Sequence, residues 1–474
     1  MLAASACAPG ASGNPRQPAI TLSACTLPNL DRPAQCGELE VFENRAAAAG
    51  RTIRLRVAVI PAGGPDTLPD PVFVLVGGPG QSAVDNAAVY ARLLAPLRIN
   101  RALVFVDQRG TGASNPLGCD LYSGQPAGAL GDFMPLDAVR SCRDSLATRA
   151  DLRFYSTETA VDDLDDVRRA LGYDQINLEA ASYGTRVGLL YLKRHGAHVR
   201  SAVLRSVSPP WTRQPLHFAL DSQAAFDSLV AACDAESACR KAFPRVRAEL
   251  DSVLARLERE PATVEMPAAD SGAPKRRVQL GRGPFAEKVR FMLYDPGLSQ
   301  FLPVLIHHAY AGDFAPFVEL AADIGRQISR VVSNGMYLSV TCVEDVNLIS
   351  PAEAATNGAG TFLRNYRVEQ QRAACELWPK GQVDSNYTAR VKSDAPVLLV
   401  SSTTDPVTPP HGAAEAAEGL SRSTQLLVPS GPHSPATRCL MGIVTEFIKA
   451  ASASALDTAC LSESRRPPFA LALP

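Results

Sequence analysis

The chain has 474 residues, of which 46% are hydrophobic and 20% are charged, so it is long enough for one large domain with an insertion, or for two domains. Its 47 basic and 48 acidic residues leave a net charge of -1, which provides no field to attract nucleic acid or an anionic membrane surface. No apolar run approaches the roughly eighteen residues that a membrane-spanning helix needs. The composition therefore predicts a globular protein and excludes the nucleic-acid-binding and membrane-spanning classes.

The first seven residues, MLAASAC, resemble the end of a bacterial lipoprotein signal, in which small residues lead into the cysteine that receives the lipid. A stretch rich in Pro, Gly, Ser and Asn follows to about residue 18, as expected of a flexible tether. We therefore expect residues 1–34 to form a signal remnant, a tether and an N-terminal segment, with a lipid anchor at Cys7. The alternative is a disordered N-terminus with an incidental thiol.

Ten of the eleven cysteines lie in neighbouring pairs along the sequence, and Cys7 is the odd one. A metal site is the competing explanation, but the sequence has no CxxC pair and no histidine at zinc-finger spacing. Disulfides persist in oxidising compartments, so the cysteines predict an exported protein, in the periplasm, in the cell envelope or secreted. The expected bridges are Cys25–Cys36, Cys119–Cys142, Cys233–Cys239, Cys342–Cys375 and Cys439–Cys460.

Three early segments have the patterns of β-strands. Residues 52–62 alternate apolar and polar side chains, which indicates a half-buried, antiparallel strand near a sheet edge. Residues 72–76 and 102–106 are almost continuously apolar, as expected of parallel strands that helices cover on both faces.

Helix and strand patterns then alternate over 158–171, 176–180, 183–194 and 202–207, which is the rhythm of βαβ units. From about residue 211 the pattern changes to helix-rich segments broken by Pro and Gly, without a clear buried strand. Alternating strand and helix patterns resume over 396–401, 411–419, 424–428 and 440–451. The sequence thus predicts an α/β fold with a mostly parallel sheet, its two core parts over 35–210 and 393–474, and an inserted helical cap over 211–392.

The pentad Ala180, Ala181, Ser182, Tyr183 and Gly184 stands between an apolar strand and an amphipathic helix. A nucleophile elbow holds its serine on a strained strand-to-helix turn, so the residues two positions before and after must be small. Ala180 and Gly184 meet this requirement. Ser182 is therefore the predicted nucleophile.

A serine nucleophile needs a base, and the base needs a carboxylate that fixes its tautomer. Of seven histidines, only His433 is expected in a loop directly after a late core strand. Asp405 follows the strand before it, and the order Ser182, Asp405, His433 is that of the α/β hydrolases. Taken singly, Asp405 and His433 could be a turn aspartate and a surface histidine; together they predict a catalytic triad.

The glycine-rich turn Gly77, Gly78, Pro79, Gly80 follows an apolar strand, where backbone N–H groups can approach a developing oxyanion. Because Pro79 has no N–H, the predicted donors are the backbone amides of Gly78 and Tyr183. The alternative is a tight turn with no catalytic part.

Six motifs, in this order, resemble the serine aminopeptidases of the prolyl and tripeptidyl aminopeptidase family, including a TAP-like C-terminal region. They are GGPGQSA (77–83), DQRGTGAS (107–114), ASYGTR (181–186), TCVEDV (341–346), CELWP (375–379) and DPVTPP (405–410). The likeness spans roughly residues 35 to 450. It implies an α/β-hydrolase core with a cap that cleaves peptides from a free N-terminus, without a metal or an organic cofactor.

In that family, carboxylates of the cap bind the α-ammonium group of the substrate. Glu344 is the first candidate for this role and Asp345 the second. The alternative for Glu344 is a surface or helix-capping carboxylate beside a disulfide.

Some motifs depart from the family pattern. Ala180 replaces the first glycine of the elbow, and Pro432 and Ser434 flank His433 where the family has glycines. Leu204, Arg205 and Ser206 resemble the prolyl group's LRG, whereas the late motifs resemble the tripeptidyl group, so the subtype stays open. A carboxylesterase or lipase on the same fold is the nearest rival function, and a non-catalytic binding protein is a rival of another class.

Overall fold

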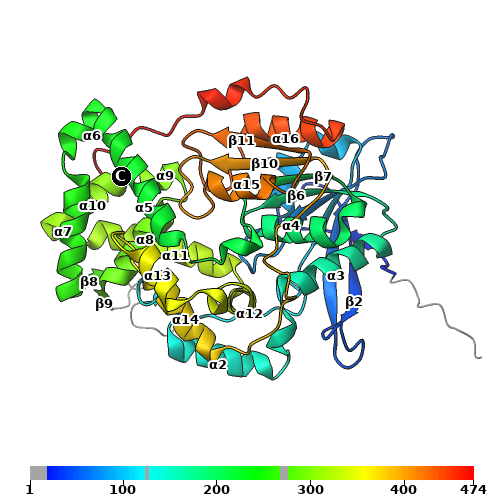
Figure 1. Cartoon of the computed structure of the whole chain (residues 1–474), viewed down its shortest axis with the longest axis horizontal. Helices are drawn as coiled ribbons and strands as arrows, with labels where there is room; N and C mark the ends of the chain where they lie inside the picture. The colour runs from blue at the N-terminus through cyan, green and yellow to red at the C-terminus, as the bar shows by residue number, and fades with distance from the viewer. Residues whose placement is uncertain (1–18, 123–127, 267–275, 474) are drawn as a thin grey trace, which may run out of the picture.

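The computed structural model describes residues 19–122, 128–266 and 276–473 (Figure 1). Its centre is a nine-stranded sheet in the order β1-β2-β3-β5-β4-β6-β7-β10-β11. The pairings among β1, β2, β3 and β5 are antiparallel, and those from β5 to β11 are parallel, which confirms the predicted mostly parallel sheet. The strands are β1 Ser23–Cys25, β2 Ala34–Phe42, β3 Thr52–Ile60, β4 Val72–Leu75, β5 Leu103–Val106, β6 Ile176–Ala181, β7 Val199–Arg205, β10 Val397–Ser402 and β11 Ser423–Val428.

Helices cover both faces of the sheet because its central strands are apolar on both. In β4, Phe73 and Leu75 belong to the same hydrophobic cluster as α3 and α4, whereas Val72 and Val74 pack with α1 and α16. Strands of this kind need cover on each side. The helices of the core are α1 Ala87–Leu93, α2 Leu136–Ala147, α3 Thr157–Ala170, α4 Tyr183–His195, α15 Pro410–Ala417 and α16 Arg438–Ala450.

The antiparallel edge extends two strands further than the sequence predicts. Strand β2 buries Leu39 and Val41 but exposes the carboxylates of Glu38 and Glu40, and it pairs with β3 over nearly its whole length. Charged side chains on the outer face of a strand near the sheet edge make its pattern polar on average, although the strand is regular. This part of the sequence therefore carries little of the apolar signal that identifies the central strands.

Between β7 and β10 the helices α5 to α11 form a group with its own hydrophobic cluster, to the left of the sheet in Figure 1, whereas α12 and α14 bury Met336, Leu338 and Ala374 in the cluster of the core. A hairpin of β8 Ala262–Met266 and β9 Arg276–Leu280 corrects the expectation that this region holds no buried strand, since Val264 and Val278 are buried in it. The helices are α5 Phe218–Ala235, α6 Ser237–Ala242, α7 Val246–Arg259, α8 Arg282–Met292, α9 Pro296–Ser299, α10 Leu302–Ala311, α11 Ala315–Val331, α12 Asn334–Glu344, α13 Pro351–Gly358 and α14 Tyr366–Leu377.

The five expected disulfides are all present: Cys25–Cys36, Cys119–Cys142, Cys233–Cys239, Cys342–Cys375 and Cys439–Cys460. Cys7 and the predicted tether, which runs to about residue 18, lie outside the described residues. Among the helices of the described ranges, none combines the length and the apolarity needed to cross a bilayer.

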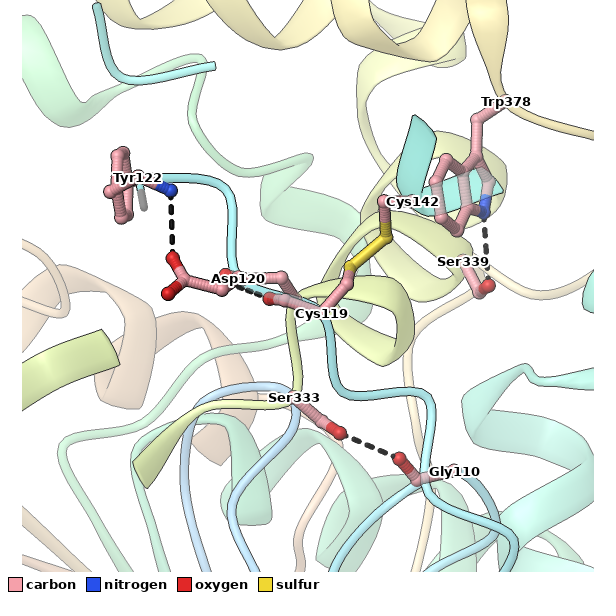
Figure 2. The surroundings of a disulfide bond; sticks show 9 residues. Gly110, Cys119, Asp120, Tyr122, Cys142, Ser333, Ser339 and Trp378 are labelled. Atoms are coloured by element: carbon pink, nitrogen blue, oxygen red, sulfur yellow. Dashed lines mark hydrogen bonds between the residues drawn. A yellow bond between two sulfur atoms is a disulfide. The ribbon is translucent and has the colours of Figure 1, made fainter. Parts of the chain in front are cut away.

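The start of α12 is bonded directly to loops of the core (Figure 2). Ser333 donates from its Oγ to the Gly110 carbonyl at 2.9 Å, and Asn334 donates to the carbonyl of Cys119, one half of the disulfide in the figure. The backbone amide of Ser333 also donates to the carbonyl of Gly80, in the glycine-rich turn. These contacts fix α12, which carries Glu344 at its other end, relative to the core.

Candidate active site

Ser182 lies on a strained turn between β6 and α4. Its backbone angles are φ 56° and ψ −127°, a conformation that side-chain-bearing residues rarely adopt and that persists only where the surroundings impose it. A Cβ atom at Gly184 would collide with the carbonyl oxygen of Leu75, so the helix can approach β4 only with glycine at this position. The small residues of the pentad thus have the local role expected of an elbow.

Folding brings Ser182, His433 and Asp405 into one hydrogen-bonded chain. The Nε2 atom of His433 lies 2.9 Å from Ser182 Oγ, and its Nδ1 atom lies 2.8 Å from Asp405 Oδ2. Ser182 follows β6, Asp405 follows β10 and His433 follows β11, so all three stand at the carboxyl ends of parallel strands. This is the arrangement of nucleophile, base and orienting carboxylate that acyl transfer requires.

The carboxylate of Asp405 is buried but well supplied with donors. The backbone amides of Val407 and Thr408 donate to Oδ1, and the hydroxyls of Thr408 and Ser206 donate to Oδ2. Burial raises the pKa of this carboxyl, but the charge of His433 and these hydrogen bonds outweigh burial, and the pKa falls to about 2. Asp405 therefore stays ionised and holds the Nδ1 side of His433.

Two residues that the sequence did not single out hold the histidine loop. Ser206, in the left-handed region at φ 58°, donates to Asp405 and accepts a hydrogen bond from the backbone amide of Ser434. Tyr294, just after α8, accepts a hydrogen bond at 2.7 Å from the backbone amide of His433 and packs its ring edge-on against the imidazole. The position of His433 thus depends on both the core and the inserted helices.

The glycine-rich turn packs directly against the nucleophile. A Cβ atom at Gly77 would come within 3.2 Å of the Cβ of Ser182, and Gly78 adopts φ +115°, which favours glycine. Gly78 and Tyr183 both line the cavity in front of Ser182. Tyr183 is the first residue of α4, and the amides of a first helical turn have no partner within the helix. Both predicted donors therefore stand on the cavity side of the elbow.

The cavity measures about 560 Å³ and is bounded by the core on one side and by the inserted helices on the other. Ser182 and His433 lie in its wall. Much of the wall that the insertion contributes is apolar, including Phe218, Phe291, Leu298, Leu320, Ile324 and Val331. A volume of this size suits a ligand of a few residues.

The two candidate carboxylates occupy different places. Glu344 is fully buried and accepts hydrogen bonds from the backbone and hydroxyl of Thr157 and from Tyr387; it is absent from the cavity lining. Asp345, one residue later, lines the cavity and accepts hydrogen bonds from Arg186 at 2.7 Å and from the backbone amide of Gln214. Asp345 is thus the one of the pair that a ligand can reach.

The acidic wall, as we call Arg186, Glu344 and Asp345, holds two carboxylates against one guanidinium. Arg186 Nη1 lies 3.6 Å from Glu344 Oε2 as well as 2.7 Å from Asp345 Oδ2. Burial raises the pKa of both carboxyls and outweighs the charge of Arg186, which favours their ionised forms. Arg186 lies one helical turn after Ser182, within the motif ASYGTR, so its spacing from the nucleophile was a signal that could have identified it.

The cavity wall also contains Arg367, which the sequence did not indicate. Its guanidinium donates to the hydroxyl of Tyr337 at 2.9 Å and lies over the ring of Phe133. Both of these residues line the same cavity. Over the described ranges, no group of three His, Cys, Asp or Glu side chains is arranged to hold a metal ion.

Two family models match the chain: one described as alpha/beta hydrolase fold over residues 70–275, and one described as TAP-like protein over residues 361–460. A tripeptidyl aminopeptidase of Streptomyces coelicolor is 26% identical over 482 aligned positions, which cover 91% of this chain and 84% of the relative. Carboxylesterase B of Mycobacterium tuberculosis is 28% identical over 82% of this chain and 78% of its own.

Among solved structures, the proline iminopeptidase of Mycobacterium smegmatis aligns with a TM-score of 0.40 and 16% identity. The alignment covers 87% of this chain and 98% of that one.

Proposed function

This chain is an α/β hydrolase with a TAP-like C-terminal region, and we propose that it is a serine exopeptidase that releases a single residue or a short peptide from the free N-terminus of its substrates. One observation carries the proposal: Asp345 and Arg186 of the acidic wall line the same cavity as the serine and histidine of the hydrogen-bonded chain, and Glu344 adds its charge from behind them. A substrate with a cationic end and a carbonyl group within reach of Ser182 satisfies both features.

In the proposed reaction, Ser182 Oγ attacks the carbonyl carbon of the scissile peptide bond while His433 Nε2 accepts its proton. The C–N bond then breaks, His433 gives the proton to the leaving amine, and the acyl group stays on Ser182 as an ester. A water molecule attacks that ester with His433 again as the base, which releases the peptide and restores the serine. Asp405 keeps the imidazole in the tautomer that this cycle needs.

The negative charge that develops on the carbonyl oxygen needs donors that are already in place. The backbone amides of Gly78 and Tyr183 are the proposed pair, and the start of α4 adds the positive end of its dipole. Loss of one donor of this type costs about 10²- to 10³-fold in kcat in serine hydrolases.

Asp345 is the proposed partner of the substrate's α-ammonium group. In their ionised forms, Glu344 and Asp345 together carry one more negative charge than Arg186 neutralises, and that excess is buried. A buried charge without a counter-ion is unfavourable, so an ammonium group that binds Asp345 completes the cluster. A peptide with a blocked N-terminus lacks this charge and is excluded.

The inserted helices act as a cap in this proposal, because they form one side of the cavity in front of Ser182. A cavity of about 560 Å³ suits the end of a short chain better than an internal peptide bond of a long or folded substrate. The five disulfides favour an exported location for the enzyme. Lipidation of Cys7 stays a prediction, which mass spectrometry of the native N-terminus tests.

A carboxylesterase is the second candidate function, because the inserted helices present a largely apolar wall to Ser182. The triad and its oxyanion donors do not distinguish an ester from an amide. What separates the two functions is whether the charge of the substrate's N-terminus matters.

The test compares three substrates under one condition: a peptidyl anilide with a free N-terminus, its N-acetylated form, and a p-nitrophenyl ester. We expect acetylation to lower kcat/KM by about 100-fold, since losing one partner of a buried ion pair costs about 2 to 5 kcal/mol. Equal cleavage of the free and acetylated anilides, with the ester cleaved much faster than both, would instead identify an esterase.

A further inference from the structure

Helices α8 and α14 bring three cations and a single carboxylate together at one side of the cavity. The basic wall, as we call this group, consists of Glu287, Lys288, Arg290 and Arg367. Glu287 Oε1 lies 2.7 Å from Arg290 Nη2 and also pairs with Arg367. All four side chains are buried, with exposed fractions of 1% for Glu287, 8% for Lys288, 0% for Arg290 and 5% for Arg367.

The basic wall carries more positive charge than its one carboxylate, Glu287, neutralises. Within the described ranges, Arg290 and Arg367 form no ion pair other than those with Glu287, and Lys288 forms none within 4 Å. The rings of Phe218, Phe291 and Tyr294 surround Arg290 and offset part of the free-energy cost of burying its charge, but they add no counter-charge. Buried charge of one sign is costly unless a partner supplies the other sign. An anion is therefore the ligand that this wall is built to receive.

Arg367 is the member of the basic wall that can reach such an anion, because it lines the cavity. Its Nε donates to Gln371 Oε1, its Nη1 to Glu287 and its Nη2 to the hydroxyl of Tyr337. A guanidinium has five N–H donors, so two remain after these bonds. The Gln371 amide nitrogen, buried beside it, has no partner among the described residues. Two guanidinium donors match the two oxygens of a carboxylate.

Helix α12 connects the two charged walls. Tyr337, Thr341 and Asp345 follow one another at intervals of four residues, and all three line the cavity. Tyr337 touches Arg367 at one end of this row, and Asp345 touches Arg186 at the other. Eight residues of helix rise about 12 Å, and three to four extended peptide residues span on the order of 10 to 14 Å. The two walls are thus separated by the length of a short peptide.

We propose that the basic wall binds a carboxylate of the substrate through Arg367 while Asp345 holds its α-ammonium group, so that the enzyme selects short peptides with an anionic group three to four residues from the free N-terminus. This inference rests on the proposed exopeptidase function and adds the substrate class to it. The carboxylate can be the C-terminus of the peptide or the side chain of an Asp or Glu residue, since the chemistry that Arg367 recognises is the same.

The first test uses the wild-type protein and alanine peptides of three to five residues, all with a free N-terminus. Each peptide is assayed as the acid and as the C-terminal amide, and the amides are also made with Glu or Gln at each position in turn. We expect one anionic series to have a kcat/KM at least about 10-fold above its neutral partner, strongest at three or four residues. An acid preferred over its amide identifies the terminal carboxylate, and Glu preferred over Gln identifies a side chain.

Equal rates for every acid and amide and for every Glu and Gln pair, in a protein that still requires the free N-terminus, would overturn the basic wall and leave the exopeptidase proposal standing. Failure of the exopeptidase proposal looks different, because then no peptide of the series is cleaved while the ester is.

The second test removes the charge that faces the cavity. Arg367→Met should bring the ratio of anionic to neutral substrates close to one, with the preference for a free N-terminus retained, and Arg367→Lys should keep part of the ratio. Arg364→Met is the matched control, because Arg364 is exposed and pairs with Glu258 away from the cavity. An Arg367→Met protein that folds, as judged by its thermal unfolding, and keeps the wild-type ratio would contradict the proposal. If this variant does not fold, the wild-type peptide series decides alone.

Discussion

The triad and the charged walls of the cavity treat buried charge in opposite ways. Asp405 is as deeply buried as Asp345, yet it receives two backbone amides, two hydroxyls and the ring of His433. The acidic and basic walls are left with a surplus of one sign each. In the proposed function, a charge that is satisfied internally serves the reaction and is indifferent to the substrate, whereas a charge that is left over selects the substrate that completes it.

The difference between the triad and the charged walls corresponds to the elements on which they stand. The triad stands on turns at the carboxyl ends of β6, β10 and β11, which the sheet holds in register. The walls stand mainly on helices of the insertion, α8, α12 and α14, with Arg186 as the contribution from the core. We therefore expect changes in the triad to act on all substrates alike, and changes in the walls to act on the differences between substrates.

The largest expected effect is that of Ser182→Ala, which removes the nucleophile common to every substrate. We expect kcat to fall by at least about 10⁴-fold on the peptidyl anilide and on the ester alike, while the protein keeps its thermal stability. Labelling by a fluorophosphonate probe should disappear at the same time. A variant that still turns over the ester at a near-normal rate would show that another group carries the reaction.

The next effect concerns the disulfide between Cys342 on α12 and Cys375 on α14, which ties the helices of the two walls together. It closes a segment of 33 residues, so the Cys342→Ala/Cys375→Ala double variant should lose about 3 to 4 kcal/mol of unfolding free energy in the loop-entropy picture. The discrimination between substrates should weaken as well, because the distance between the walls is no longer held.

The matched control is Cys233→Ala/Cys239→Ala, whose bridge closes 6 residues at the junction of α5 and α6, away from both walls. Its smaller loop predicts a loss of about 2 kcal/mol, with unchanged substrate ratios. Equal kinetic effects of the two double variants would mean that the Cys342–Cys375 bridge contributes stability alone.

The sequence predicted best what depends on neighbours in the chain. The strands around residues 72–75 and 103–106 are apolar at every position, so their burial on both faces follows from composition alone. Ser182 has a local signal because its turn demands small residues at 180 and 184. Asp405 and His433 have a weaker signal, but their order along the chain and their places after strands are enough to select them.

The ion pairs of the walls were beyond such reasoning, although Glu344 and Asp345 were candidates, because the partners are far apart in the sequence. Arg186 and Asp345 are separated by 159 positions, and Glu287 and Arg367 by 80. Even the choice between Glu344 and Asp345 depends on where α12 ends: Glu344 is its last residue and points into the packed interior, while Asp345 leaves the helix and reaches the cavity. A shift of one residue at a helix end is finer than any sequence pattern resolves.

The third prediction concerns the choice between Glu344 and Asp345 as the partner of the substrate's ammonium group. Asp345→Asn should lower the preference for a free over an acetylated N-terminus by about 100-fold, equivalent to about 2.7 kcal/mol, and should leave ester cleavage within a few-fold of wild type. Glu344→Gln should change the preference by less than about 10-fold, because Glu344 acts on the substrate only through the charge it adds behind Arg186. The test is to measure kcat/KM of both variants and of the wild type on the free and the acetylated anilide. If Glu344→Gln has the larger effect, Glu344 rather than Asp345 meets the ammonium group.

The smallest expected effect is a dependence of anion selection on pH. Burial lowers the pKa of Lys288, Glu287 opposes that shift, Arg367 and Arg290 add to it, and the pKa falls to about 8. Below that pH the basic wall carries three cations, and above it Lys288 is neutral and two remain. The ratio of kcat/KM for an anionic substrate to that of its neutral partner should therefore fall by about 3-fold between pH 7 and pH 9, as expected for the loss of one charge at a distance of several ångströms.

Taking the ratio removes every other pH effect that acts equally on the two substrates. Lys288→Met removes the titrating group, so its ratio should be lower at pH 7 and constant over the same range. A wild-type ratio that stays flat from pH 7 to pH 9 would mean that Lys288 does not contribute to the field at the carboxylate, and that Arg367 alone selects the anion. A ratio that rises with pH would contradict a basic wall altogether, because deprotonation can only reduce its positive charge.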